Sequence, residues 1–189
     1  MTAATDLGSS ASDNITSNTT PAFAITAPPT GGSVVMRVDG VAVPATYNPS
    51  TGTLTPDAAL TDGPHAISYQ LVDAAGNTSA VSPALPVTID TLAPAVPTVT
   101  ALTSNSLTPV ISGGATLATG DLLTVTVNGA TYTVDPAHPA TGISFANGVW
   151  SINTATATPS SGSLAAFVSG QSYSVAATAT DAAGNSSTD

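Results

Sequence analysis

The sequence predicts an all-β chain built from two tandem sandwich domains, and three observations support this prediction. The five residues Asp-Ala-Ala-Gly-Asn occur at 73–77 and again at 181–185, so their aspartates lie 181 − 73 = 108 positions apart. Each copy follows a run in which apolar and polar residues alternate, which is the pattern of a strand with one buried face. No stretch of useful length has the helical period. We therefore expect each motif to be a tight loop at the end of a strand, in two versions of one β-domain.

The first repeat contains about seven short strand patterns separated by turn residues. Asp39-Gly40 is a strong hairpin turn, and Pro44 indicates an edge strand or a bulge. The expected strands cover 22–25, 34–38, 41–43, 45–47, the surroundings of Leu54, 65–72 and 85–89. This number of short strands with frequent turns is typical of an immunoglobulin-like sandwich.

A short linker at 90–97 contains two prolines, which favour an extended conformation. The second repeat begins at 103–109, which matches 16–21, and its hairpin turn is Asn128-Gly129. Its expected strands are 122–127, 130–134, 143–145, 149–152 and 171–180. We therefore divide the chain into domains 1–97 and 98–189.

Alternation within the strands predicts which side chains are buried. The expected buried residues are Phe23, Val34, Met36, Tyr69, Leu71, Val125, Val127, Trp150, Tyr173 and Val175. In the first repeat, 90 − 77 = 13 positions separate Asn77 from Asp90 and hold the closing strand, whereas only 189 − 185 = 4 separate Asn185 from Asp189. We expect the second domain to lack its last strand and to leave an unpaired edge near Gln171–Thr180.

Composition narrows the classes of partner. Of 189 residues, 42% are hydrophobic, which is enough to build cores, and only 6% are charged. All the acidic residues are aspartates, Arg37 is the sole basic residue, and the formal net charge is −10. A nucleic acid or an anionic membrane is therefore not an expected partner, whereas cations are.

The absence of cysteine excludes disulfides, so stability must come from the cores or from bound ions. No apolar run approaches the ~18 residues of a membrane span, so we expect no membrane insertion. Residues 1–6 have neither the basic start nor the apolar centre of a signal peptide. If the protein is exported, we expect this chain to be an internal piece or its export signal to lie elsewhere.

Motifs of enzyme chemistry are missing from the sequence, and we do not expect an enzyme. His65 and His138 lie in different repeats without metal-ligand spacing, and we interpret both as surface histidines. The sequence contains no nucleophile elbow, no zinc-protease motif and no phosphate-binding glycine loop. Trp150 could stack on a sugar, but a single tryptophan in a sandwich is usually part of the core.

The aspartates allow two interpretations. Asp and Asn side chains bond to nearby backbone amides and so stabilise turns, and we assign Asp39, Asp57, Asp62 and Asp135 to this role. Calcium instead requires six to eight oxygen ligands from carboxylates, carbonyls and water. The calcium hypothesis places Asp73 and Asp90 at one end of the sandwich, since they follow two successive strands. Its full set of ligand candidates is Asp73, Asn77 and Asp90, their counterparts Asp181, Asn185 and Asp189, and the entry-loop residues Asp6 and Asp13; Asp121 stays open.

Several segments resemble the bacterial immunoglobulin-like repeats of giant secreted adhesins. They are residues 73–79 followed by 89–94, the entry loop 6–16, and 120–129. The resemblance implies a structural extender on the bacterial cell surface, exported by a type I system, whose partners are neighbouring repeats of the same polypeptide. It also implies calcium ions at the domain junctions, with Asp73 and Asp90 as ligands, that stiffen a stalk used in adhesion or biofilm formation.

Two other functions remain open from the residues. The long loops of the second repeat could recognise a sugar or a protein, which would make the chain a binding module. The chain could also be an accessory module of a secreted enzyme that degrades glycans.

Overall fold

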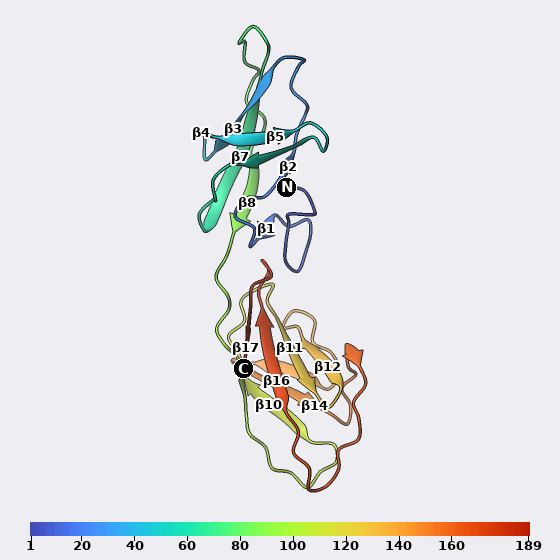
Figure 1. The fold of residues 1–189 in the computed structure, drawn as a ribbon. Helices are drawn as coiled ribbons and strands as arrows, with labels where there is room; N and C mark the ends of the chain where they lie inside the picture. The colour runs from blue at the N-terminus through green and yellow to red at the C-terminus, as the bar shows by residue number, and fades with distance from the viewer. The chain divides into compact units, whose positions relative to one another are not determined.

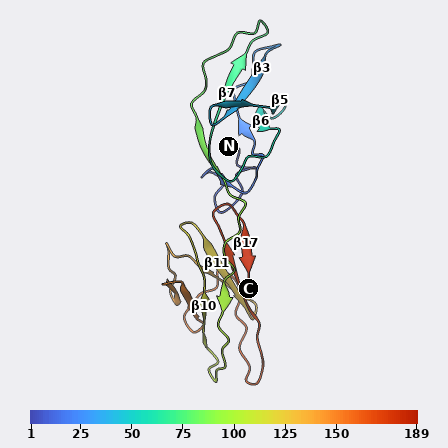
Figure 2. The ribbon, with the colours of Figure 1, turned by 90° about the vertical axis from the view of Figure 1, so that its left-hand side faces the viewer.

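The computed structural model describes all residues, 1–189, and contains strands but no helix. No element is therefore a helix that could cross a membrane. The chain divides into two compact units: the first unit is Met1–Thr91 with Ala182–Gly184, and the second unit is Leu92–Asp181 with Asn185–Asp189. The predicted all-β class of two tandem immunoglobulin-like sandwiches is confirmed (Figures 1 and 2).

Two sheets form the first unit. The larger has the order β1 (Ile15–Thr16), β8 (Leu85–Ile89), β7 (Gly63–Val72), β3 (Ser33–Val38) and β4 (Val41–Val43). The smaller has the order β2 (Phe23–Ala24), β6 (Thr53–Pro56) and β5 (Ala45–Asn48). The chain changes sheet at Pro44, which has no amide hydrogen for a strand ladder. Between the sheets lie the buried residues Phe23, Met36, Val38, Leu54, Ile67, Val87 and Ile89.

The second unit also consists of two sheets with a core between them. Its larger sheet has the order β15 (Ser161–Gly162), β12 (Ala130–Val134), β11 (Leu122–Val127), β16 (Val175–Thr180) and β17 (Ser186–Thr188). Its other sheet has the order β13 (Ile143–Ala146), β14 (Val149–Asn153), β10 (Val110–Gly114) and β9 (Thr98–Val99). The largest buried side chains of its core are Trp150, Tyr132, Leu123 and Ile152.

Both predicted hairpin turns are confirmed by backbone geometry. Asp39 and Gly40 have φ values of 53° and 82°, and Asn128 and Gly129 have 46° and 88°. A type I′ turn needs a positive φ at both central residues, which Asn, Asp and Gly adopt with the least strain. These turns place β4 on β3 and β12 on β11.

Trp150 is a core residue, as expected from its place in a sandwich. Its side chain is fully buried, and its Nε1 donates a hydrogen bond to the carbonyl of Thr98 at 3.2 Å. Gly113 lies opposite it in the sheet, and a Cβ there would lie 2.6 Å from the indole ring. The ring therefore needs a glycine at 113 and is not available to stack on a sugar.

Half of the predicted core positions are fully buried, namely Phe23, Met36, Val125, Val127 and Trp150. The other half, Val34, Tyr69, Leu71, Tyr173 and Val175, are half-buried. The half-buried positions lie toward the ends of β3 and β7 and at or before the start of β16. Alternation identified the correct face of each strand but not where the core ends along it.

The expected unpaired edge of the second domain needs a correction. β17 pairs antiparallel with β16, with Thr180 opposite Ser186 and Thr178 opposite Thr188. Four residues after Asn185 are therefore enough for a short strand. The prediction of an unpaired edge is wrong for residues 178–180, which pair with β17. Residues 171–174 belong to no strand.

The hydroxyl of Tyr132 generates a stability prediction. Tyr132 is fully buried, its hydroxyl has no hydrogen-bond partner, and burial raises its pKa. A buried, unpaired polar group costs about 1–3 kcal/mol. We expect Tyr132→Phe to raise the free energy of unfolding of the second unit by about 1 kcal/mol or more. Urea unfolding followed by fluorescence of Trp150, the single tryptophan, measures this unit.

The matched control is Tyr173→Phe. The hydroxyl of Tyr173 accepts a hydrogen bond from the amide of Val168 at 2.7 Å, so its loss should lower the free energy of unfolding. A loss of stability in Tyr132→Phe as large as in Tyr173→Phe would contradict the prediction.

Candidate functional site

The direction of β8 separates two residues that were expected to lie together. β7 and β8 are antiparallel, with Gly63 opposite Ile89 and Ile67 opposite Leu85. Asp90 therefore lies beside the start of β7, whereas Asp73 follows its last residue, roughly 33 Å away at the rise of a strand. The prediction that Asp73 and Asp90 share one end of the sandwich is wrong, and these two carboxylates do not meet at one ion.

The two Asp-Ala-Ala-Gly-Asn loops have the same internal hydrogen bonds. Asp73 Oδ1 accepts from the amide of Asn77 at 2.8 Å, and Oδ2 accepts from Asn77 Nδ2 at 2.8 Å. Asp181 accepts from the amide and from Nδ2 of Asn185, both at 2.9 Å. The Asn77 side chain is the largest cause that holds the pKa of Asp73 below its usual value. The arrangement is that of a strong turn, in which the Asp and Asn side chains bond to each other.

Asp189 also lies away from Asp181. The amide of Asp189 donates to the carbonyl of Ala177, four residues before Asp181 along the β16 line, and its carboxylate accepts from the amide of Val99. Four residues of strand correspond to about 13 Å. The predicted grouping of Asp181, Asn185 and Asp189 therefore reduces to the Asp181–Asn185 turn.

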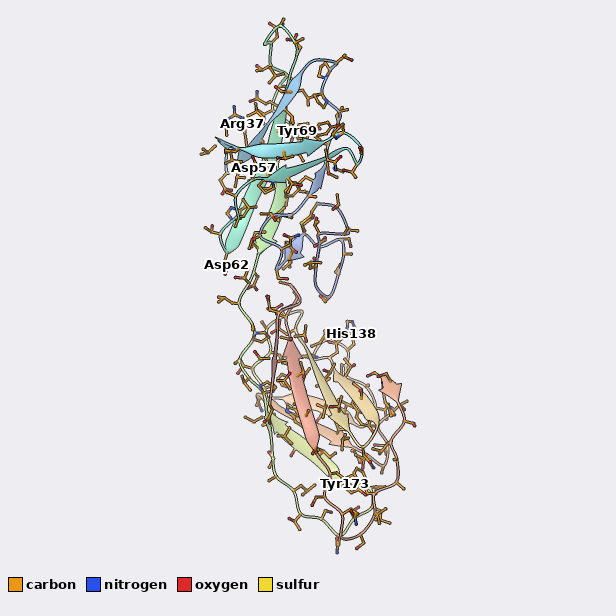
Figure 3. The ribbon with its side chains drawn as sticks, in the orientation of Figure 1. Arg37, Asp57, Asp62, Tyr69, His138 and Tyr173 are labelled. Atoms are coloured by element: carbon orange, nitrogen blue, oxygen red, sulfur yellow. The ribbon has the colours of Figure 1, made fainter.

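The end of β8 and the entry loop of the first unit bring other aspartates to one region. The amide of Asp90 donates to the carbonyl of Thr16 at 3.0 Å, and the amide of Thr88 donates to Asn14 at 2.8 Å. Asp62, which Figure 3 labels, directly precedes β7. Its carboxylate accepts hydrogen bonds from the amide and the hydroxyl of Thr91. We call this region the β8 exit, defined by the residues Asp6, Asp13, Asn14, Thr16, Asp62 and Asp90. The sequence could have indicated that Asp62 belongs to this region. Asp62 directly precedes β7, and the end of an antiparallel partner strand lies beside the start of β7.

Asp6 is the unusual carboxylate of the β8 exit. Its side chain is 5% exposed, Oδ2 accepts from the amide of Asn14 at 3.1 Å, and the buried Oδ1 has no hydrogen-bond partner. The Met1 amino group has its pKa lowered chiefly by burial, while the charge of Asp6 raises it. A buried carboxylate oxygen without a donor is costly unless a cation compensates its charge.

The remaining geometry limits what the β8 exit can bind. No group of three or more His, Cys, Asp or Glu side chains in residues 1–189 is placed to hold a metal ion. Asp13 Oδ1 accepts from the amide of Ile15 at 3.0 Å, which is a local turn bond. A calcium ion here would take carboxylate oxygen from Asp6 and complete its shell with backbone carbonyls, hydroxyls and water, which are ligands calcium accepts.

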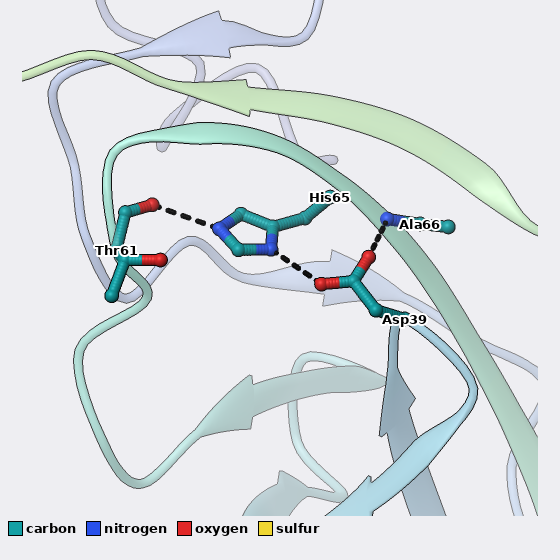
Figure 4. Close-up of polar contacts among 4 residues, drawn as sticks. All are labelled: Asp39, Thr61, His65 and Ala66. Carbon is teal, nitrogen blue, oxygen red and sulfur yellow. Dashed lines mark hydrogen bonds and ion pairs between the residues drawn. The ribbon is translucent and has the colours of Figure 1, made fainter.

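The polar pair at Asp39 and His65 is structural. Asp39 Oδ2 lies 2.8 Å from His65 Nδ1, and His65 Nε2 lies 2.8 Å from the carbonyl of Thr61 (Figure 4). Asp39 Oδ1 accepts from the amide of Ala66 at 2.8 Å. Because each ring nitrogen faces an oxygen acceptor, the protonated imidazolium satisfies both contacts.

Comparison with known proteins supports the fold of the first unit. Residues 1–91 match the family model described as a bacterial Ig-like domain. No curated protein matches the sequence. A solved structure of SGBP-B from the mixed-linkage glucan utilization locus of Bacteroides ovatus, in complex with a mixed-linkage heptasaccharide, is 17% identical with a TM-score of 0.33. The similarity covers 93% of this chain and 40% of that chain.

The Asp39–His65 pair makes stability depend on pH. The hydrogen bond that His65 donates to Asp39 raises the pKa of His65, and the amide of Ala66, with His65, lowers the pKa of Asp39. The contribution of His65 to the free energy of unfolding is therefore fully present below its unfolded pKa of about 6.5. This contribution is lost as the pH rises through the raised pKa of the folded state. The contribution of Asp39 is present above about pH 4 and is lost as the pH falls through its lowered folded pKa.

We expect His65→Gln to destabilise the first unit more at about pH 5.5 than at pH 8. The difference should not exceed about 1 kcal/mol, because the pair is partly exposed. Hydrogen exchange of the backbone amides of β3 and β7 at the two pH values measures this difference in stability. His138→Gln is the control, since its ring bonds Asp135 at 2.9 Å while 85% exposed. An equal loss at both pH values would show that the charge of His65 does not contribute.

Proposed function

We propose that this chain is a structural extender of a bacterial surface protein. Its two immunoglobulin-like units would act as spacers that project binding domains for adhesion or biofilm formation. The family match of residues 1–91 supports a bacterial immunoglobulin-like module, and the repeated loops at 73–77 and 181–185 support a tandem of such modules. The partners would be neighbouring repeats of the same polypeptide, outside the cell.

We propose that the bound ion is calcium. The main support for a calcium site is Oδ1 of Asp6, which is buried and has no hydrogen-bond partner. Asp90 and Asp13 belong to the same region through Thr16 and Asn14, and they are the further ligand candidates. Asp73, Asn77, Asp181 and Asn185 are better explained as turn residues, because their side chains already bond to one another. The ion would compensate the charge of Asp6 and fix the entry loop to the end of β8.

A second candidate function is recognition of a sugar or protein by the second unit. A cavity of about 640 Å³ there is lined in part by Phe167 and Tyr173. Their rings meet edge to face with centroids 4.8 Å apart. A panel of soluble oligosaccharides, titrated while the amide resonances of 167–173 are recorded, would identify this function.

The calcium proposal predicts a rise in melting temperature. Extracellular calcium modules bind at ~10⁻⁴–10⁻³ M, so about 10 mM calcium should stabilise the first unit by about 1.4–2.7 kcal/mol relative to chelator. For a unit of this size the melting temperature should rise by about 5 °C or more. Asp6→Asn should abolish most of this rise, and Asp90→Asn should reduce it.

The control is Asp57→Asn, which makes the same charge change at a carboxylate that accepts from the hydroxyl of Thr46. It should keep the full response to calcium. Small-angle scattering tests stiffening separately, by a larger maximum dimension with calcium than with chelator. If the wild type melts at one temperature with calcium and with chelator, the calcium proposal fails.

A further inference from the structure

The chain has two Asn-Gly pairs, Asn128-Gly129 and Asn147-Gly148, and each is the two-residue turn of a β-hairpin in the second unit. The first pair joins β11 to β12, and the second joins β13 to β14. Asn147 and Gly148 have φ values of 51° and 77°, close to the 46° and 88° of Asn128 and Gly129. The two turns therefore share their local sequence and have similar φ values, and they differ in what surrounds them.

An asparagine that precedes a glycine can lose its side-chain amide in water without an enzyme. The backbone nitrogen of the glycine attacks Cγ of the asparagine and gives up its proton, ammonia leaves, and a five-membered succinimide ring remains. Water then opens the ring at one of its two carbonyls and produces aspartate or isoaspartate. The net reaction consumes one water and releases one ammonia. Glycine favours the attack because it has no Cβ to hinder the approach of its nitrogen.

A folded turn opposes this ring closure. A type I′ turn, the mirror image of type I, holds ψ near about +30° at its first central residue, and this directs the glycine nitrogen away from the asparagine side chain. The backbone must rotate at this residue before the nitrogen and Cγ can meet. The rate in the folded chain therefore depends on how readily each turn opens, and each hydrogen bond that opening breaks lowers the rate.

The turn at Asn128 is held by the segment that follows β15. The Asn128 side chain donates from Nδ2 to the carbonyl of Ala165 at 2.8 Å, and the amide of Ala165 donates to the carbonyl of Asn128 at 3.1 Å. The amide of Ser163 donates to the carbonyl of Gly129 at 3.2 Å. These bonds fix both the side chain that would be attacked and the backbone that would have to rotate.

The turn at Asn147 has less support from its surroundings. Asn147 is exposed, and its side chain makes no hydrogen bond within the chain. The turn receives one hydrogen bond from outside the hairpin, from the amide of Ala115 to the carbonyl of Gly148 at 2.9 Å. β13 is an edge strand that pairs only with β14, whereas β11 and β12 each have a partner on both sides. The hairpin of Asn147 therefore opens more readily than the hairpin of Asn128.

We propose that Asn147 is a site of spontaneous deamidation, with the nitrogen of Gly148 as the nucleophile, and that hydrogen bonds protect Asn128. The aspartate product keeps the turn, since Asp39 occupies the same position of the Asp39-Gly40 turn with a φ of 53°. It adds one negative charge to the tip of the hairpin. The isoaspartate product adds a methylene carbon to the main chain, so the two-residue turn no longer fits and the pairing of β13 with β14 weakens. The proposal is independent of calcium binding and of the extender role.

Peptide mapping by mass spectrometry tests the proposal after the full chain has been kept in mildly alkaline buffer. In the folded chain Asn147 should convert about tenfold or more faster than Asn128, because opening the turn at Asn128 breaks more hydrogen bonds. In concentrated urea, where neither turn exists, the two asparagines should convert at similar rates. Asn147→Asp is the reference for the aspartate product. Hydrogen exchange of the amides of 143–146 should be the same in this variant as in the wild type, and faster in the isoaspartate form.

A second variant tests the protection of Asn128. Ala165→Pro removes the amide that donates to the carbonyl of Asn128, so Asn128 should convert faster while Asn147 keeps its rate. Trp150 fluorescence shows whether the second unit of this variant is folded. Conversion of Asn128 as fast as that of Asn147 in the folded wild type overturns the proposal. So does the absence of converted Asn147 in the folded chain by the time that the chain in urea has converted completely.

Discussion

The antiparallel register of the closing strand is the constraint on which most of this structure depends. Because β8 returns along β7, the end of β8 lies beside the start of β7, and the loop at 73–77 is left at the other end. The same register gives β1 its only partner and places Val87 and Ile89 in the core. It therefore decides both which polar side chains can meet and which apolar side chains close the sandwich.

Local patterns were sufficient to predict the strands and turns but not the pairing of strand ends. Alternation over 67–71 and the Asp39-Gly40 pair are properties of a few adjacent residues, so the sequence shows them directly. Whether Asp73 meets Asp90 depends on the direction in which β8 pairs, which involves residues far apart in sequence. Two residues that each follow a strand in an antiparallel hairpin lie at opposite ends of it, and this geometric rule argues against the expected pair.

The same residue types serve turns and cation sites, and only the surroundings distinguish the two roles. Asp73 and Asp181 have donors within four residues, so their carboxylates are satisfied by the loop itself. Asp6 lies on a loop whose fold buries it beside Asn14 and leaves one oxygen without a donor. The sequence could nominate all three aspartates, but it could not show which one would be buried without a full set of hydrogen bonds.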